Sequence, residues 1–183
     1  ERGTYILNSK DMCLINHISE LDKAGIKSFK IEGRMKSTYY VATVVNAYRR
    51  AIDNYLNNND SNFDYIEELE KTSNRAFTTG FYFHDEHKTN KVSSRLIQNY
   101  DFIALVVEDA KDGKVLIEHR NKFALGDELE VLSPNDTFDK IIKLNEIVDE
   151  KGNSIEEVKK VKQRVYIKTD LALKKGDILR KKR

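Results

Sequence analysis

The stretch "FKIEGRMKS", residues 29–37, is the part of the sequence on which the fold depends. Its apolar start before Gly33 is typical of a β-strand, and Ser37 can cap a following helix because its hydroxyl accepts a backbone N–H. The letters IEGR also match an engineered protease-cleavage linker, which would have no place in the fold. A linker would interrupt the hydrophobic periodicity, whereas here it continues on both sides. We therefore interpret the stretch as a native strand-to-helix junction.

The residues on either side predict alternating strands and helices. Thr4–Leu7 is expected to form a strand, Ser9 to cap a helix that Gly25 ends, and residues 26–33 to form a second strand. The helix after Ser37 carries an apolar stripe made of Val41, Val44, Val45, Tyr48, Ile52, Tyr55 and Leu56.

Strands and helices that alternate with short connections are typical of right-handed parallel β/α units. Two such units cannot close a sheet or cover both of its faces. We therefore expect residues 1–60 to be the C-terminal part of an incomplete α/β barrel, a TIM-barrel remnant.

After a helical and loop connector at residues 61–94, the hydrophobic period changes to two. Six strands are predicted between residues 95 and 183, at 102–108, 114–119, 127–132, 139–149, 163–168 and 177–181. Short antiparallel strands in this number favour a small closed β-barrel. The predicted fold class is α+β, with Gly126 and Gly176 at similar tight turns before two of the strands.

Composition and charge narrow the classes of function. The chain of 183 residues is 39% hydrophobic and 34% charged, which is typical of a soluble globular protein. No apolar run approaches the roughly 18 residues of a membrane helix. One cysteine excludes an internal disulfide, and we expect a cytoplasmic protein. Net charge is only +2, but residues 159–183 hold eleven basic and two acidic side chains.

Glu32, Arg34 and Lys36 are the candidate catalytic residues. Residues that directly follow a strand of an α/β barrel lie on its catalytic face, and a helix N-terminus attracts anions. A carboxylate flanked by two cations suits anion binding or a charge-relay role. The alternative is a solvated turn whose charges help to cap the helix.

Two further groups of residues are candidates for binding. Cys13 is predicted on the first turn of a helix, where a thiolate or metal ligand is favoured, although a lone cysteine is more often a small buried apolar residue. A basic set near Tyr166 could contact RNA phosphates, or could only keep the surface solvated. Its members are Lys159, Lys160, Lys162, Arg164 and Lys168.

Three separated motifs carry a resemblance to a known family. They are "NSKDMCLINHISELDKAGIKSFKIEGRMKSTYYVATVVNAYRRAID" at 8–53, "SNRAFTTGFY" at 73–82 and "RNKFALGDELEVL" at 120–132. In this order they resemble the C-terminal half of the collagenase-like peptidase family (peptidase family U-32). The resemblance implies an N-terminal α/β barrel followed by a small C-terminal β-barrel. Ala76 stands where the family usually has glycine.

The resemblance also implies a role for Cys13. Its position resembles one of the cysteines with which family members hold an iron–sulfur cluster. The partner cysteines are then expected upstream of Glu1, so we expect the isolated chain to hold no cluster and to be inactive.

The family name says peptidase, but relatives are also linked to oxygen-independent hydroxylation of the tRNA wobble uridine and of ribosomal RNA. We expect the intact protein to act in tRNA or RNA hydroxylation, with the C-terminal barrel aiding substrate recognition. The alternatives are a genuine collagenase-like peptidase that acts on a peptide, and a non-catalytic interaction module. No membrane partner is expected, and the isolated chain is expected to self-associate through its exposed α/β face.

Overall fold

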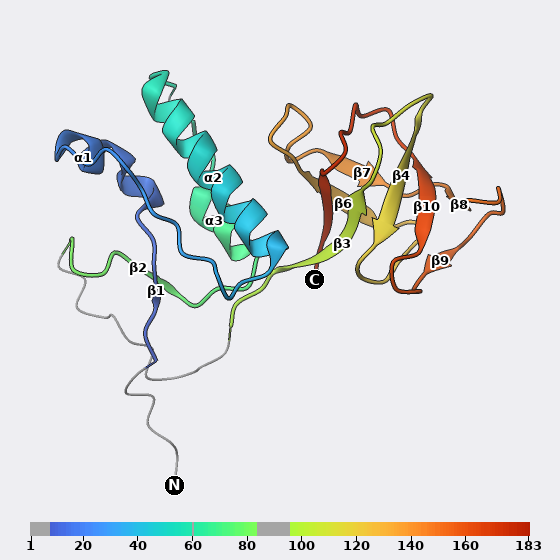
Figure 1. Cartoon of the computed structure of the whole chain (residues 1–183), viewed down its shortest axis with the longest axis horizontal. Helices are drawn as coiled ribbons and strands as arrows, with labels where there is room; N and C mark the ends of the chain where they lie inside the picture. Colours follow the sequence, from blue (N-terminus) through green and yellow to red (C-terminus); the bar gives the residue numbers. More distant parts are fainter. Residues whose placement is uncertain (1–7, 60, 84–95) are drawn as a thin grey trace, which may run out of the picture. The chain divides into compact units, whose positions relative to one another are not determined.

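The computed structural model of the chain describes residues 8–59, 61–83 and 96–183. The chain divides into two compact units, Glu1–Asn99 and Tyr100–Arg183, called here the N-terminal and the C-terminal unit (Figure 1). The finer three-part division expected from the sequence stays a prediction. The predicted strand Thr4–Leu7 lies outside the described residues.

The N-terminal unit is built around one long helix, α2 (Thr38–Leu56). Ser37 caps α2 as predicted, because its Oγ accepts a hydrogen bond from the Tyr40 N–H at 3.1 Å. Against α2 pack the shorter helices α1 (Ile18–Lys23) and α3 (Tyr65–Glu70) and a 3₁₀ helix, Ile15–His17. The buried cluster of this unit consists of Cys13, Ile15, Ile18, Val44, Ala47, Ala51 and Leu69.

The predicted strand at residues 26–33 is wrong, because this segment pairs with no strand among the described residues. The unit has instead a short parallel pair, β1 (Asp11–Met12) with β2 (Phe77–Thr78). Two backbone hydrogen bonds, from Asp11 N–H to Ala76 O and from Cys13 N–H to Thr78 O, hold residues 11–13 in this strand pair. The helix predicted from Ser9 is therefore displaced to Ile18, since long-range pairing overrides local helix preference. The TIM-barrel remnant stays a prediction.

The C-terminal unit is a curled seven-stranded antiparallel sheet in the order β7-β6-β11-β3-β4-β10-β8 (Figure 1). Its strands are β3 (Tyr100–Val106), β4 (Lys114–His119), β6 (Glu128–Leu132), β7 (Ile141–Lys143), β8 (Ile147–Asp149), β10 (Arg164–Lys168) and β11 (Ile178–Lys182). A separate two-stranded sheet joins β5 (Phe123–Ala124) to β9 (Glu157–Val158). The whole chain is therefore mixed α and β.

The predicted closed barrel of six strands is corrected in two respects. Residues 139–149 form two strands, because β7 pairs with β6 whereas β8 pairs with β10. These two strands stand at opposite ends of the strand order, so the ladder of the described residues stays open between them. Period-two alternation finds strands but does not say which strands pair.

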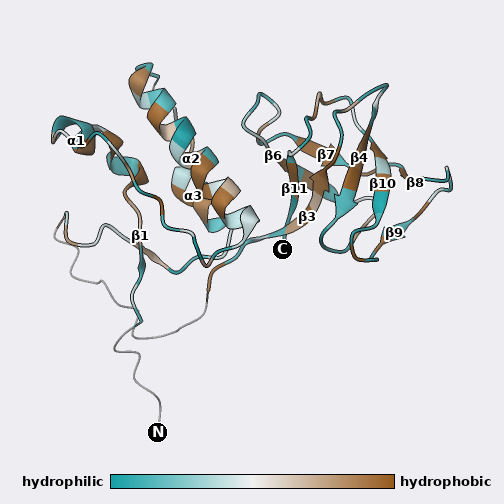
Figure 2. Ribbon diagram, viewed as in Figure 1, coloured by the Kyte–Doolittle hydropathy of each residue, from teal (hydrophilic) through white to brown (hydrophobic). Residues whose placement is uncertain are grey.

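One apolar core fills the curled sheet. It is formed mainly by alternating residues of the strands, including Ile103, Ile117, Leu129, Val165 and Leu179. Figure 2 shows the same concentration as brown segments in β3 and β4, with hydrophilic turns around them. The inward alternation is what fixes the register of each strand.

The two Gly-Asp turns are built alike, as the sequence predicted. Gly126 and Gly176 adopt φ of +85° and +97°, a region that favours glycine. Asp127 then accepts a bond from the Ala124 N–H at 2.9 Å, and Asp177 accepts one from the Lys174 N–H at 2.8 Å. The strands that follow, β6 and β11, pair with each other.

Candidate functional site

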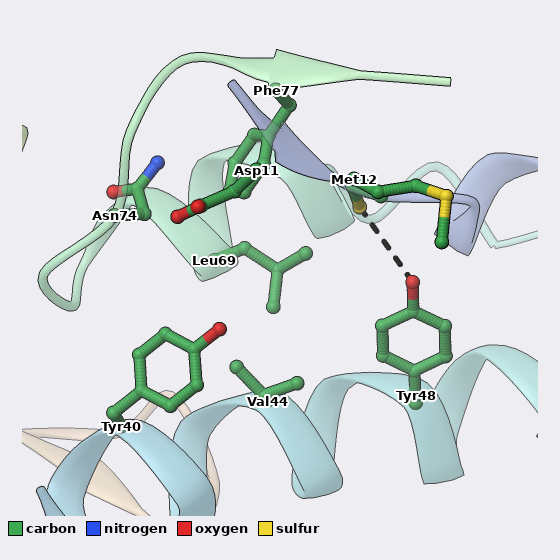
Figure 3. A pocket seen from close by; sticks show the side chains of 9 residues that line it. Asp11, Met12, Tyr40, Val44, Tyr48, Leu69, Asn74 and Phe77 are labelled. Atoms are coloured by element: carbon green, nitrogen blue, oxygen red, sulfur yellow. Dashed lines mark hydrogen bonds between the residues drawn. The ribbon is translucent and has the colours of Figure 1, made fainter. Parts of the chain in front are cut away.

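A small hollow of about 40 Å³ lies beside Cys13 in the N-terminal unit. Figure 3 shows side chains from α2 reaching toward it on one side, and those of β1 and β2 on the other. Its lining consists of Asp11, Met12, Cys13, Tyr40, Val44, Tyr48, Leu69, Asn74 and Phe77. Four elements that are distant in sequence therefore meet at one cysteine.

Cys13 follows β1 and is buried, with 8% of its surface exposed. Its Sγ lies 3.7 Å from the hydroxyl of Tyr48, which also accepts a hydrogen bond from the Leu14 N–H at 3.2 Å (Figure 3). Burial raises the pKa of the Cys13 thiol, and burial likewise raises the pKa of Tyr48. The expected position on the first turn of a helix is wrong, and with it the expected lowering of the thiol pKa.

Lys36 is the one member of the predicted catalytic trio that approaches this hollow. Its Nζ donates to Ser73 O at 3.3 Å, lies 4.0 Å from Asp11 Oδ2 and stands 4.7 Å from the centre of the Tyr40 ring. Asp11 is held in turn by the Arg75 N–H at 2.9 Å. The cation thus completes a polar corner at the edge of the hollow.

Glu32 and Arg34 make a local turn instead. Glu32 Oε1 accepts a hydrogen bond from the Arg34 N–H at 2.9 Å, and both residues are exposed. This geometry is what the turn-and-cap interpretation describes. The catalytic roles of Glu32, Arg34 and Lys36 stay predictions.

The sequence did not single out Asp11, Tyr40 or Asn74, and it selected Tyr48 only as a member of the apolar stripe. Asn74 is 1% exposed, its Nδ2 donates to Arg75 O at 2.8 Å, and its Oδ1 has no partner among the described residues. Burial and the Asp11 charge raise the pKa of Tyr40. The spacing of Tyr40, Val44 and Tyr48, four residues apart on a predicted helix, was the signal that could have placed them on one face.

A second hollow of about 200 Å³ also contacts Cys13. Its lining consists of Cys13, Asn16, His17, Ile66, Phe77, Thr78 and Thr79. The His17 ring stacks on Phe83 with the ring centres 4.0 Å apart. Cys13 therefore contacts open space in two hollows of the same unit.

The described residues alone do not fit an iron–sulfur cluster. Such clusters are usually held by four cysteine thiolates, whereas Cys13 is the single cysteine of the chain. Across residues 8–59, 61–83 and 96–183 no group of three or more His, Cys, Asp or Glu residues could hold a metal ion. The role of Cys13 as one ligand stays a prediction.

The predicted nucleic-acid-binding residues lie on and beside β10 in the C-terminal unit, and all five are exposed. Lys159 pairs with Glu157 at 3.1 Å, and Arg164 Nε pairs with Glu118 at 3.3 Å. Lys168 stands directly opposite Lys114 in the β10–β4 ladder. A role of this set in RNA binding stays a prediction.

The mixed α/β chain with a curled antiparallel sheet matches two family models. Residues 1–92 match peptidase family U32, and residues 98–180 match the peptidase family U32 C-terminal domain. The chain belongs to peptidase family U32. The first matched segment lies in the N-terminal unit, and all but the first two residues of the second lie in the C-terminal unit.

Curated relatives carry two kinds of name. The chain is 35% identical over 99% of its length to tRNA hydroxylation protein P1 of Bacillus subtilis, of which the match covers 44%. It is 36% identical over 73% of its length to tRNA hydroxylation protein P of Escherichia coli, covering 30% of that protein. It is 38% identical over 43% of its length to a collagenase of Porphyromonas gingivalis, covering 22% of it. The chain thus spans less than half the length of these relatives.

Among the described residues, no helix is long and apolar enough to cross a membrane.

Proposed function

We propose that the protein acts in tRNA hydroxylation and that the C-terminal unit helps to recognise the RNA. The observation that carries this proposal is the similarity to tRNA hydroxylation protein P1, which runs through both units. The exposed cations along β10 support it, because Lys and Arg side chains are the usual contacts to phosphate oxygens.

In this proposal the N-terminal unit provides part of the reaction site. Cys13 serves as one ligand of an iron–sulfur cluster whose other ligands are not among the described residues. Arg34 and Lys36 bind anionic groups of the substrate, and Glu32 orients the turn that carries Arg34. Lys36 is the best placed of the three, because it already contacts Asp11 and Tyr40 at the edge of the hollow beside Cys13.

The test compares tRNA from cells that have the protein with tRNA from cells that lack it. The nucleosides are separated, and their masses are measured by mass spectrometry. We expect one nucleoside to become lighter by one oxygen atom when the protein is missing, and the intact protein to restore it. The Cys13→Ala variant should restore nothing, whereas Glu67→Gln, an exposed change on α3, should restore the nucleoside fully. Unchanged nucleosides in the cells without the protein would reject the proposal.

A peptidase is the second candidate, because the collagenase relative matches 43% of this chain. Purified intact protein should then cleave gelatin, and Glu32→Gln should abolish cleavage while Glu67→Gln leaves it intact. Gelatin that stays whole under conditions in which tRNA is modified would leave hydroxylation as the function.

A further inference from the structure

We propose that two facing segments of the C-terminal unit, residues 118–122 and 157–164, form one binding strip for the phosphates of an RNA strand. We call it the cationic strip. The inference rests on the proposed function and assigns RNA contact to two residues that the sequence had not selected, Arg120 and Lys122. In this inference the turn at residues 160–163 is the part of the strip that projects into the RNA surface.

Backbone pairing brings the two segments together although about forty residues separate them in sequence. Arg164 stands opposite Glu118 where β10 pairs with β4. Farther along, the His119 N–H donates to Gln163 O at 2.8 Å, and Phe123 stands opposite Val158 where β5 pairs with β9. The segments therefore run antiparallel past one another.

Two carboxylates each join a cation of one segment to a cation of the other. Glu118 Oε1 lies 2.9 Å from Arg120 Nη2, and its Oε2 lies 3.3 Å from Arg164 Nε.

In the same way, Glu157 Oε1 lies 2.5 Å from Lys122 Nζ, and its Oε2 lies 3.1 Å from Lys159 Nζ. These hydrogen bonds raise the pKa of Lys122 and lower the pKa of Glu157, so both groups are charged at neutral pH.

The cationic strip has a net positive charge, and its ion pairs hold the charged side chains in fixed positions. One carboxylate cancels one positive charge, so each bridged set stays cationic. Over the whole strip, six basic side chains face two carboxylates. Because the carboxylates already hold four of the cations in position, less side-chain freedom is lost when they bind a phosphate. A strip of ordered, exposed cations is the kind of surface that tracks a nucleic-acid backbone.

The turn at residues 160–163, which lies within the strip, gives an independent indication. The Gln163 N–H bonds to Lys160 O at 3.0 Å, which leaves Val161 and Lys162 at the centre of a tight turn. Lys162 adopts a φ of +56°, a conformation that side chains other than glycine take at a cost in strain. A cation thus occupies a position at which glycine would be easier to accommodate. Strain of this kind is typical of functional sites.

Val161 completes the turn as an apolar contact. It is 87% exposed between Lys160 and Lys162. An apolar tip flanked by two ammonium groups fits a ribose or a base edge with phosphates on both sides, whereas a site for free inorganic phosphate needs no such tip.

The experiment measures the affinity of the full chain for an unmodified tRNA transcript across a range of salt concentrations. The Arg120→Gln/Lys122→Gln variant should lower the salt slope of log Kd by about 2, because two phosphate contacts are lost. The matched control is Lys111→Gln/Lys114→Gln. It removes the same charge at the other end of β4, and its slope should stay within about 0.5 of that of the unaltered chain.

Equal slopes for the two double variants would overturn the strip, since only total charge would then matter, while the proposed function would stand. Absence of tRNA binding by the unaltered chain would overturn both. Inorganic phosphate should displace tRNA no more than another salt of the same ionic strength does, because the strip recognises an RNA strand. Displacement of tRNA at far lower phosphate concentrations would indicate a site for phosphate itself.

A further variant separates the binding role of the turn from a structural one. Lys162→Gly relieves the positive φ, so the thermal midpoint should stay equal or rise. Affinity for the tRNA transcript should nevertheless fall several-fold. A variant that loses thermal stability and retains affinity would show that Lys162 serves the fold and not the RNA.

Discussion

The two units of the chain differ in how completely they bury their apolar surface. Among the described residues, eleven exposed large apolar side chains belong to the N-terminal unit and three to the C-terminal unit. The buried cluster of the C-terminal unit has sixteen members and that of the N-terminal unit has seven. The C-terminal unit therefore covers its own core, whereas the N-terminal unit leaves more apolar surface exposed among the described residues.

The difference follows from the kind of pairing in each unit. Strands of two residues in the N-terminal unit fix little backbone and bury little surface, while the seven-stranded sheet joins distant segments around one core. A helix such as α2 is stabilised mainly by the packing of its apolar face. Yet Val41 and Val45 on α2 are 40% and 47% exposed.

The largest expected effect tests how much the C-terminal unit depends on its buried charges. Arg180 is fully buried, and its Nε and Nη2 both donate to Glu130 Oε1. Arg180→Met should lower the free energy of unfolding by about 3–5 kcal/mol, because a buried carboxylate loses its cation. Urea unfolding measures the loss. Arg164→Met removes an exposed ion pair and should lower the free energy of unfolding by about 1 kcal/mol or less. Equal losses for the two variants would contradict this difference between a buried and an exposed ion pair.

The next effect tests the open surface of the N-terminal unit. We expect the isolated chain to self-associate through this surface, with an average mass in light scattering that rises with concentration. Val45→Glu places a charge on the exposed face of α2 and should raise the concentration needed for association by about tenfold or more. Ile141→Glu alters an exposed apolar residue of the other unit and should change little. A mass that does not depend on concentration would reject the prediction.

A smaller effect depends on pH. Neither ring nitrogen of the buried His119 has a partner among the described residues, and burial lowers the pKa of this side chain, with the charge of Arg120 adding to the effect. As the pH falls below 6.5, the unfolded chain takes up the proton first, so the folded unit loses stability. The loss should not exceed about 1.4 kcal/mol per pH unit.

Urea unfolding between pH 7 and pH 5 measures this loss. His119→Phe should flatten the pH dependence, because the ring that titrates is gone. A profile that His119→Phe does not alter would assign the acid sensitivity to other groups.

The smallest effect concerns the cross-strand pair Lys114 and Lys168. Like charges directly opposite each other in an antiparallel ladder destabilise it. Lys114→Glu should therefore raise the free energy of unfolding by about 0.2–1 kcal/mol. The double variant Lys114→Glu/Lys168→Glu restores a like-charge pair and should lose the gain. A gain that persists in the double variant would show that the pair is not its source.

How much of the fold could be predicted depends on the range of the interactions involved. The cap at Ser37, the turns at Gly126 and Gly176 and five of the six period-two strands are local features, and these predictions are confirmed. The strand at residues 26–33 failed, because a strand needs a partner that local sequence does not identify. The start of the helix predicted from Ser9 was wrong, because residues 11–13 pair with residues 76–78 and the α-helix begins only at Ile18.

The candidate sites divide in the same way. Cys13, Lys36 and the basic residues of β10 could be selected from the sequence, because their residue types occur in recognisable local patterns. Tyr48 lies beside Cys13, and Arg120 and Lys122 lie beside the turn at residues 160–163, only through contacts that span 35 to 46 residues.

The sequence by itself determined the family, the alternation of strands in the second half of the chain and the local chemistry of its turns. These depend on side-chain period and on backbone preference, which act over a few residues. Only the tertiary structure decided that the strands form a seven-stranded open ladder, that the Cys13 thiol is buried beside Tyr48, and that two distant segments share their carboxylates. The physical reason is that burial, pKa shifts and ion pairs arise from contacts between residues that the chain brings together only on folding.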